Sequence, residues 1–438
     1  MSLLDATSLP VLIVAALAAS CCALIGSFLV LRRSALLGDA ISHGILPGIV
    51  VGFALSGSRE IVPMFIGALV AALGTTLLTD LLHRRLRIDG DAAMGVVFTT
   101  LFALGVVLLE VYAGRVDLDP GCVLHGQVEY AAIDPASFAI LGWTPPRGAV
   151  TLGVTLLLDL VFVLLLWKEL LITSFDGDLA HSLGIPPGPL HLALMGMTAL
   201  TTVASFEAVG SILVVAMLIV PAMVATLLTD RLLGVLLAAQ GVALASAGLG
   251  LWSAQRLDTS VAGMMAVSVG GLLAVAFLLA PGQGWLPRRL RRLSLAIRIA
   301  EEDLLGSLYR AEERQAGGGG IERPSGAPPH HPAWLRIGAG LRLRWRAEVV
   351  KSDRTLTLTQ RGRGRGRRLV RRHRLWENYL SDLLALPASH LHDPAHRIEH
   401  FLDEELTRRI EERLDGPERD PHGRAIPAAD HEPGEEER

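Results

Sequence analysis

Two separate parts of the chain place a carboxylate and an imidazole at helical ligand spacing. Asp39 and His43 are four residues apart in LRRSALLGDAISHG (31–44), so on a helix they share one face. A carboxylate oxygen with an imidazole nitrogen suits Mn²⁺, Fe²⁺ or Zn²⁺ better than Ca²⁺. The alternative is that both side chains lie in a loop between hydrophobic segments and are merely solvated there.

A larger group of similar residues lies near the end of the chain. It consists of His373, Glu377, His392, His396, Glu399 and His400. The first two are four residues apart, and the last three stand at i, i+3 and i+4, with a further histidine one turn before them. Such a face can build a tetrahedral or mixed nitrogen and oxygen metal site. The competing interpretation is a charged, solvated helix face, because AHRIEHFLDEELTRRIEERL is rich in charge throughout.

The elements that must position these residues divide the chain into two parts. Of the 438 residues 51% are hydrophobic, and the mean hydropathy of +0.45 is too high for an ordinary soluble protein. Apolar runs fill 1–282, whereas 283–438 is rich in Arg, Glu, Pro and His. The net charge of −3 averages two unlike parts, so it excludes no class of partner.

The first part contains stretches long enough to cross a membrane, which takes roughly 20 apolar residues. They lie near 9–31, 61–82, 93–113, 149–167, 189–205, 208–229, 232–254 and 259–280, with a shorter one at 37–56. Non-helical backbone is costly in lipid. The sequence therefore predicts an all-α membrane bundle of eight or nine transmembrane helices, followed by a small, mostly α-helical tail.

Basic residues predict the orientation of this bundle. Those on one side of the alternating loops are Arg32, Arg33, Arg84, Arg85, Arg87, Lys168 and Arg231, on the same side as the Arg-rich tail. The excess makes this side and the tail cytoplasmic, and with nine spans the N-terminus is outside. Arginines follow the first apolar run and none precedes it, which favours a retained span over a cleaved signal peptide. Cys21, Cys22 and Cys122 offer no disulfide framework.

Five ordered segments of the first part resemble the permease family of manganese, zinc and iron ABC importers. They are LLGDAISHGILPG, MGVVFTTLFALGVVLL (94–109), VDLDPGCVLHGQVEY (116–130), FDGDLAHSLGIP (175–186) and VGSILVVAMLIVPAMVA (209–225). The resemblance implies a multi-pass subunit of the bacterial inner membrane that forms a homo- or heterodimer. It also implies a metal substrate, delivered by an extracytoplasmic binding protein, and ATP hydrolysis in a separate subunit. Asp39 and His43 match the family's translocation-path metal motif.

The segment 174–188, SFDGDLAHSLGIPPG, predicts a short amphipathic helix that ends at Gly-Ile-Pro-Pro. In importers such a helix docks into a groove of the ATPase; the alternative is a surface helix with no partner. The expected coupling residues are Phe175, Asp176, Leu179, Ala180, Leu183 and Gly184. The chain has no GxxxxGK[ST], so we expect no ATP hydrolysis by that mechanism and no enzyme activity.

Three further polar residues of the membrane part are weaker candidates. Asp159 either lines the path or bonds to a neighbouring helix, and Glu207 and His125 could help to receive the ion. For each of them a structural role is favoured over a ligating one.

The tail carries a second resemblance. LTLTQRG…RRHRLWENYL…LHDPAHRIEHFLDEEL…ERDPHGRAIP is similar to the metal-dependent repressors of the diphtheria-toxin-repressor and manganese-repressor type, over the wing end, linking helix and dimerisation helices. The resemblance assigns one metal site to His373, Glu377 and His392. It assigns a second to His396, Glu399, His400 and Asp303, with His396 standing where relatives carry Cys or Glu. The resemblance also implies that the tail is a small winged-helix or dimerisation-like region. Divalent metal is thus expected as a tail ligand, and the permease itself needs no cofactor.

DNA binding by the tail is doubtful on the sequence. Residues 310–352, where a helix-turn-helix belongs, contain GGGG and Pro-rich stretches and no clear recognition-helix pattern. The run 361–374 has eight arginines in fourteen residues and looks helical only from Arg367. It could contact phosphates or anionic membrane lipid, but such contacts give affinity and no sequence readout.

These observations predict four segments: the permease domain (1–285), a linker and degenerate winged-helix-like region (286–352), a repressor-like metal-binding and dimerisation region (353–428) and a disordered acidic end (429–438). The leading hypothesis is a metal importer permease with a fused metal-sensing tail. The alternatives are a membrane-tethered, metal-responsive DNA-binding regulator and a secondary carrier that needs no ATPase. The metal stays open among Mn²⁺, Fe²⁺ and Zn²⁺.

Overall fold

The computed structural model describes residues 8–56, 61–113, 128–133, 144–316, 331–352, 355–384, 387 and 390–429. Its contacts divide the chain into two units, Met1–Pro287 and Arg288–Arg438. The predicted segment 116–130, with His125, falls almost wholly outside the described residues. The same holds for the side chain of Glu207 and for the acidic end.

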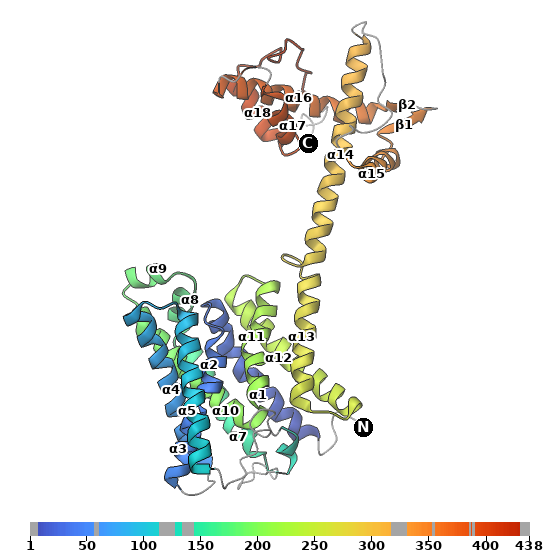
Figure 1. Ribbon diagram of the computed structural model, residues 1–438. Helices are drawn as coiled ribbons and strands as arrows, with labels where there is room; N and C mark the ends of the chain where they lie inside the picture. The colour runs from blue at the N-terminus through green and yellow to red at the C-terminus, as the bar shows by residue number, and fades with distance from the viewer. Residues whose placement is uncertain are drawn as a thin grey trace, which may run out of the picture. The chain divides into compact units, whose positions relative to one another are not determined.

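The first unit, the membrane unit, is a helical bundle (Figure 1). Its elements are α1 (Ser8–Leu31), α2 (Leu37–Gly44), α3 (Leu46–Ser56), α4 (Ile61–Leu86), α5 (Gly90–Ala113), η1 (Val128–Ala132), α7 (Arg147–Leu165), α8 (Trp167–Phe175), α9 (Gly177–Ser182), α10 (Pro187–Val209), α11 (Ser211–Leu228), α12 (Leu232–Leu257) and α13 (Val261–Leu279). Within the described residues, nine stretches are long and apolar enough to span a membrane. The range 37–56 is among them, although it is two helices, α2 and α3, that meet at Ile45. Pro47, two residues further on, has no N–H to donate to the helical ladder.

Helix α1 lies at the centre of this unit, against α7, α10, α11 and α12 (Figure 1). It is apolar on all faces and every residue from Ala18 to Leu29 is buried, as expected of a central helix. Glycines allow the closest approaches. A Cβ on Gly26 would lie 1.9 Å from the carbonyl oxygen of Leu218 in α11, and one on Gly48 of α3 would lie 2.0 Å from that of Gly67 in α4. Small residues of this kind let membrane helices pack backbone to backbone.

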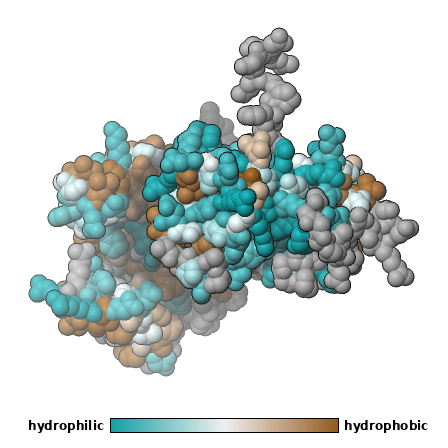
Figure 2. Space-filling view, turned by 90° about the horizontal axis from the view of Figure 1, so that it is seen from above, coloured by the Kyte–Doolittle hydropathy of each residue, from teal (hydrophilic) through white to brown (hydrophobic). Residues whose placement is uncertain are grey.

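The second unit, the tail unit, contains the rest of the chain. Its elements are α14 (Trp285–Ala316), which begins just before the unit boundary, α15 (Ala333–Trp345), β1 (Val349–Ser352), β2 (Thr355–Leu358), α16 (Gln360–Leu384), α17 (His392–Ile398) and α18 (Glu404–Arg413). The strands form an antiparallel hairpin in which Val349 pairs with Leu358 and Ser352 with Thr355. The face of the molecule in Figure 2 is largely hydrophilic, with separate hydrophobic patches.

Two expectations for the tail unit need correction. A regular helix, α15, stands in the region where no clear recognition helix was expected, and it is followed by a wing-like hairpin. Its buried face of Leu335, Ala339 and Leu343 packs on α14. Helix α16 begins at Gln360 and not at Arg367, because Gly362 lies against the backbone of Glu348, where a Cβ would be 2.0 Å from its carbonyl oxygen.

Candidate metal centres

Asp39 and His43 share one face of α2, as their spacing predicts. His43 Nε2 lies 3.5 Å from Asp39 Oδ1, and both side chains are about two-fifths exposed, at 38% and 40%. The imidazole lies against two rings of α5, with centroid distances of 5.9 Å to Phe98 and 5.6 Å to Phe102. The pair therefore belongs to a helix in a candidate membrane span, held by aromatic packing, and offers two donors for a metal ion.

Asp159 of α7 makes a bond to a neighbouring helix, which was one of its two predicted roles. The carboxylate is fully buried and accepts hydrogen bonds from Thr201 Oγ1 of α10 at 3.0 and 2.9 Å. A buried intramembrane carboxylate needs such a partner. Its observed contact is thus a link between α7 and α10.

The predicted coupling segment contains α9, a helix of six residues. Asp176 is its N-cap and accepts a hydrogen bond from the backbone N–H of Leu179 at 2.9 Å. Ala180 is buried, whereas Phe175, Leu179 and Leu183 are 57%, 48% and 59% exposed. The helix ends before Gly184, whose positive φ of 77° suits glycine. An apolar surface is thus left open on a short, capped helix.

In the tail unit, four predicted ligands meet in one cluster, called here the four-residue cluster. Asp303 comes from α14, His396 from α17, and Glu399 and His400 follow α17 directly. One ligand atom from each of the four lies within 4.8 Å of the others. His396 Nδ1 is 2.9 Å from Glu399 Oε1, and His400 Nε2 is 3.2 Å from Asp303 Oδ1. Two imidazoles and two carboxylates therefore converge on one point.

His373, Glu377 and His392 meet in the same way and form the three-residue cluster. His373 Nε2 lies 3.0 Å from both Glu377 Oε1 and His392 Nδ1, and His392 Nδ1 lies 3.2 Å from the same carboxylate oxygen. The first two residues are one turn apart on α16, while His392 begins α17. The cluster therefore exists only because these two helices pack together.

A buried carboxylate of the four-residue cluster also contacts the three-residue cluster. Glu399 directs Oε1 at His396, and its Oε2 lies 2.7 Å from His373 Nδ1, the ring nitrogen that faces away from the three-residue cluster. Both atoms are buried, and their approach is too poorly aligned for a regular hydrogen bond. Glu399 is 0% exposed. A single buried carboxylate thus belongs to one cluster and touches a member of the other.

In these clusters the carboxylates and the histidines stabilise each other's charged forms. Burial alone would raise the pKa of Asp303, but its contacts with His400 and His331 lower it to about 2. Burial likewise opposes ionisation of Glu399, yet His373 and His396 hold its pKa at about 2. The pKa of His400 would fall on burial, but Asp303 and Glu302 raise it to about 9. Without metal at neutral pH, ionised carboxylates therefore hold a protonated histidine.

This donor set fits a divalent transition metal. Neutral imidazole and carboxylate are ligands that Mn²⁺, Fe²⁺ and Zn²⁺ all accept. A cation at the four-residue cluster would replace the proton of His400 and leave the carboxylates ionised. It would also offset the negative charge that now gathers around Glu399. The residues present are thus sufficient to hold an ion in each cluster.

Three residues near the clusters escaped the sequence analysis. Glu302 Oε2 lies 2.8 Å from His400 Nδ1, so it orients that ring in the manner of an outer-shell carboxylate. His331 Nε2 lies 2.5 Å from Asp303 Oδ2, and His422 Nε2 lies 3.9 Å from Glu377 Oε1. No spacing rule reveals them, because their partners are distant in sequence or face another helix.

The Arg-rich run of α16 is largely engaged within the tail unit. Arg363 pairs with Glu312, Arg365 with Glu348, Arg371 with Glu411, Arg372 with Glu404 and Arg374 with Glu313. At least five of its eight arginines thus have carboxylate partners outside α16. These ion pairs connect α16 to α14, to the residue that precedes β1 and to α18.

Comparison with known proteins agrees with this division. Residues 5–280 match the ABC 3 transport family, and residues 359–428 match the iron dependent repressor, metal binding and dimerisation domain. The manganese transport system membrane protein MntD of Bacillus subtilis is 45% identical over 63% of this chain and 92% of that protein. The zinc transport system membrane protein TroD of Treponema pallidum is 37% identical over 63% of this chain and 75% of its own length.

A solved structure supports the fold of the membrane unit. It is PsaBC from Streptococcus pneumoniae in complex with Fab, with a TM-score of 0.55 and 28% identity. The match covers 65% of this chain and 95% of that one. Because the ABC 3 transport family profile matches more than half of this chain, the chain belongs to that family. C-terminal to its membrane unit it carries an iron-dependent-repressor-type metal-binding domain.

Proposed function

We propose that the chain is the permease subunit of an ATP-driven importer for a divalent transition metal, with a tail that senses the same class of metal. The observation that carries this proposal is the family match over residues 5–280, which contains the Asp39/His43 pair. Several relatives with that match are manganese or zinc transport proteins. The substrate is therefore Mn²⁺, Zn²⁺ or the chemically similar Fe²⁺.

The metal path runs past Asp39 and His43 in this proposal. Two donors are fewer than the four that a tetrahedral site requires. Within the described residues, the larger donor clusters belong to the tail unit. The remaining ligands are then water or the equivalent pair of a second permease subunit, which agrees with a homo- or heterodimeric bundle. An incomplete site of this kind also suits transport, because an ion must leave as well as bind.

A separate ATPase subunit supplies the energy. The exposed apolar side chain of Leu179 on α9, with Phe175 and Leu183 on either side of that helix, gives such a partner a helix-in-groove contact. An extracytoplasmic binding protein would deliver the ion on the opposite face. The distribution of Arg and Lys supports a cytoplasmic location for the tail.

The tail unit would report the internal metal concentration. When cytoplasmic metal fills the two clusters, α14, α16 and α17 become joined through one set of ligands, and the stiffened tail inhibits further uptake. DNA binding is less well supported. The outer face of α15 presents Trp334, Ile337, Leu341 and Trp345, at 57%, 65%, 59% and 83% exposure, whereas base readout is made mainly by polar side chains.

Metal uptake in cells that express this chain with its ATPase subunit tests the permease proposal. We expect Asp39→Ala and His43→Ala to abolish uptake of one of the three metals while the protein stays in the membrane. Asp91→Ala is the control, because Asp91 is an exposed carboxylate at the start of α5. Undiminished uptake in both variants would place the path elsewhere.

A second experiment tests the sensing tail. In the triple variant His392→Ala, His396→Ala and His400→Ala, uptake should continue at high internal metal, where the wild type slows. Identical slowing in the two proteins would remove the sensing role and leave the permease proposal intact.

A further inference from the structure

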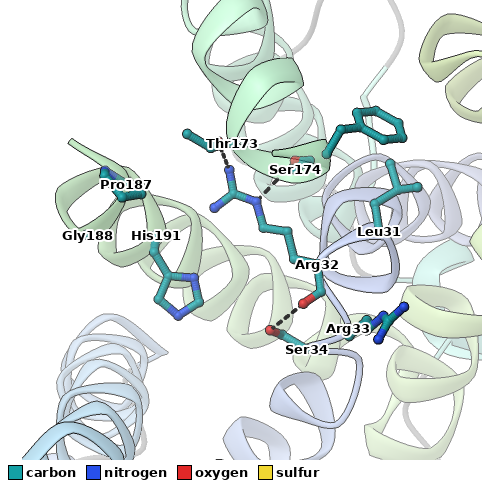
Figure 3. Close-up of a pocket in the computed structure, with 10 residues that line it drawn as sticks. Leu31, Arg32, Arg33, Ser34, Thr173, Ser174, Pro187, Gly188 and His191 are labelled. Atoms are coloured by element: carbon teal, nitrogen blue, oxygen red, sulfur yellow. Dashed lines mark hydrogen bonds between the residues drawn. The ribbon is translucent and has the colours of Figure 1, made fainter. Parts of the chain in front are cut away.

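A cavity of about 620 Å³ opens in the membrane unit between the end of α1, the end of α8 and the start of α10 (Figure 3). Its lining includes the polar side chains of Arg32, Thr173, Ser174 and His191. The apolar side chains of Leu31, Phe175 and Pro187 also line it. None of the ten lining residues is acidic. The cavity thus combines positive charge and hydroxyl groups with an apolar wall.

Arg32 is the central cation of this cavity. Its Nε donates to Ser174 Oγ at 3.1 Å and its Nη2 to Thr173 Oγ1 at 2.5 Å. Both partners are neutral hydroxyls, and no carboxylate in the described part of the chain forms an ion pair with Arg32. A partly buried guanidinium without a counter-ion is costly. These bonds use two of its five N–H donors, so the others are available to an oxyanion.

The position of the cavity favours one source of that anion. Leu31 is the last residue of the α1 span and Pro187 is the first residue of the α10 span. The cavity therefore lies where the hydrocarbon core gives way to headgroups, and basic pockets between membrane helices at that level bind anionic lipid headgroups. The apolar contribution of Leu31 and Phe175 suits a ligand that is itself part apolar.

We propose that this cavity binds the phosphate group of an anionic phospholipid, with the Arg32 guanidinium as its main ligand. The hydroxyls of Thr173 and Ser174 hold the guanidinium in place. Because α8 leads directly into α9, a bound lipid would fix the base of that helix. The proposal depends only on the membrane location of the chain and not on its transport activity.

The test is thermal unfolding of the purified full chain in detergent, without any ATPase subunit. Phosphatidylglycerol should raise the unfolding temperature, whereas phosphatidylcholine and inorganic phosphate should not. Arg32→Gln should require about ten to a hundred times more phosphatidylglycerol for the same shift, as loss of a charged hydrogen bond predicts. Arg231→Gln is the matched control, because it removes the same charge from an exposed arginine of the membrane unit that does not line the cavity.

Other results would overturn the proposal. Equal stabilisation by inorganic phosphate would identify a soluble anion as the ligand. Equal loss in both variants would reduce the effect to general surface charge. If phosphatidylglycerol does not stabilise the chain alone, and addition of the ATPase subunit stabilises the wild type but not Arg32→Gln, Arg32 pairs with a carboxylate of that partner and the lipid proposal is wrong. If Arg32→Gln fails to fold, native mass spectrometry of the wild type replaces it, and retention of phosphatidylglycerol no greater than that of phosphatidylcholine would refute lipid binding.

Discussion

Substituting Glu399 by Gln should weaken both metal clusters of the tail, although Glu399 belongs to only one of them. In the four-residue cluster the change removes a negative ligand beside His396 and His400. In the three-residue cluster it removes the carboxylate that lies 2.7 Å from His373 Nδ1. Loss of an outer-shell partner costs about 10- to 100-fold in metal affinity, which corresponds to roughly 1.4 to 2.8 kcal/mol.

The assay counts bound Mn²⁺ by the electron paramagnetic resonance signal of the free ion. The full chain is titrated in detergent, in an Asp39→Ala, His43→Ala background that leaves only the tail sites. Asp303→Asn should affect the four-residue cluster alone, and Glu377→Gln the three-residue cluster alone. If Glu399→Gln keeps the affinity of the three-residue cluster within about twofold, less than the outer-shell range, the contact between Glu399 and His373 does not couple the sites and this reasoning is wrong.

Three further predictions follow from single contacts. Metal binding to the tail should strengthen as pH rises from 6 to 9. The pKa of His400 is raised to about 9, so at lower pH this side chain carries a proton that the metal must displace. Calorimetry in buffers of different ionisation enthalpy would show the released proton, and a pH-independent affinity would contradict this prediction. Leu179→Asp should abolish co-purification of the ATPase subunit without loss of the chain from the membrane, since Leu179 is exposed on α9; unchanged co-purification would exclude α9 as the contact. Gly362→Ala should lower the unfolding temperature of the tail and cost about 1–3 kcal/mol of stability, because its Cβ would lie 2.0 Å from the Glu348 carbonyl oxygen. The control is Gly364→Ala, whose Cβ meets no atom within 4 Å and which should stabilise α16 by up to about 1 kcal/mol. Equal effects of the two substitutions would refute the close-contact argument.

The membrane unit was largely predictable because the apolar composition of the sequence determines where its membrane-spanning helices lie. Runs of apolar residues set the spans within a few residues, and 37–56 was predicted with the bounds that the structure gives. The division of that range into two helices at Ile45 was not predicted, since composition does not report where one helix ends and the next begins. Asp39 and His43 share a face because their separation is local.

The tail shows where local spacing stops being informative. Histidines and carboxylates at i, i+3 and i+4 marked both clusters, and the repressor resemblance supplied Asp303. The contacts of Glu302, His331 and Glu399 with their neighbours cross between helices, so no periodicity contains them. The sequence predicted a helix only from Arg367, whereas α16 begins at Gln360, where Gly362 packs closely on Glu348.

The glycine contacts of the membrane unit limit how an alternating-access cycle can proceed. Where Gly26 lies against the backbone of Leu218, and Gly48 against that of Gly67, the paired helices leave no room even for a Cβ atom between them. Packed interfaces of this kind shift as units and do not deform gradually. We therefore expect α1 with α11, and α3 with α4, to move as two rigid bodies. The hinge then falls at Ile45, between the helix that carries Asp39 and His43 and the helix locked to α4.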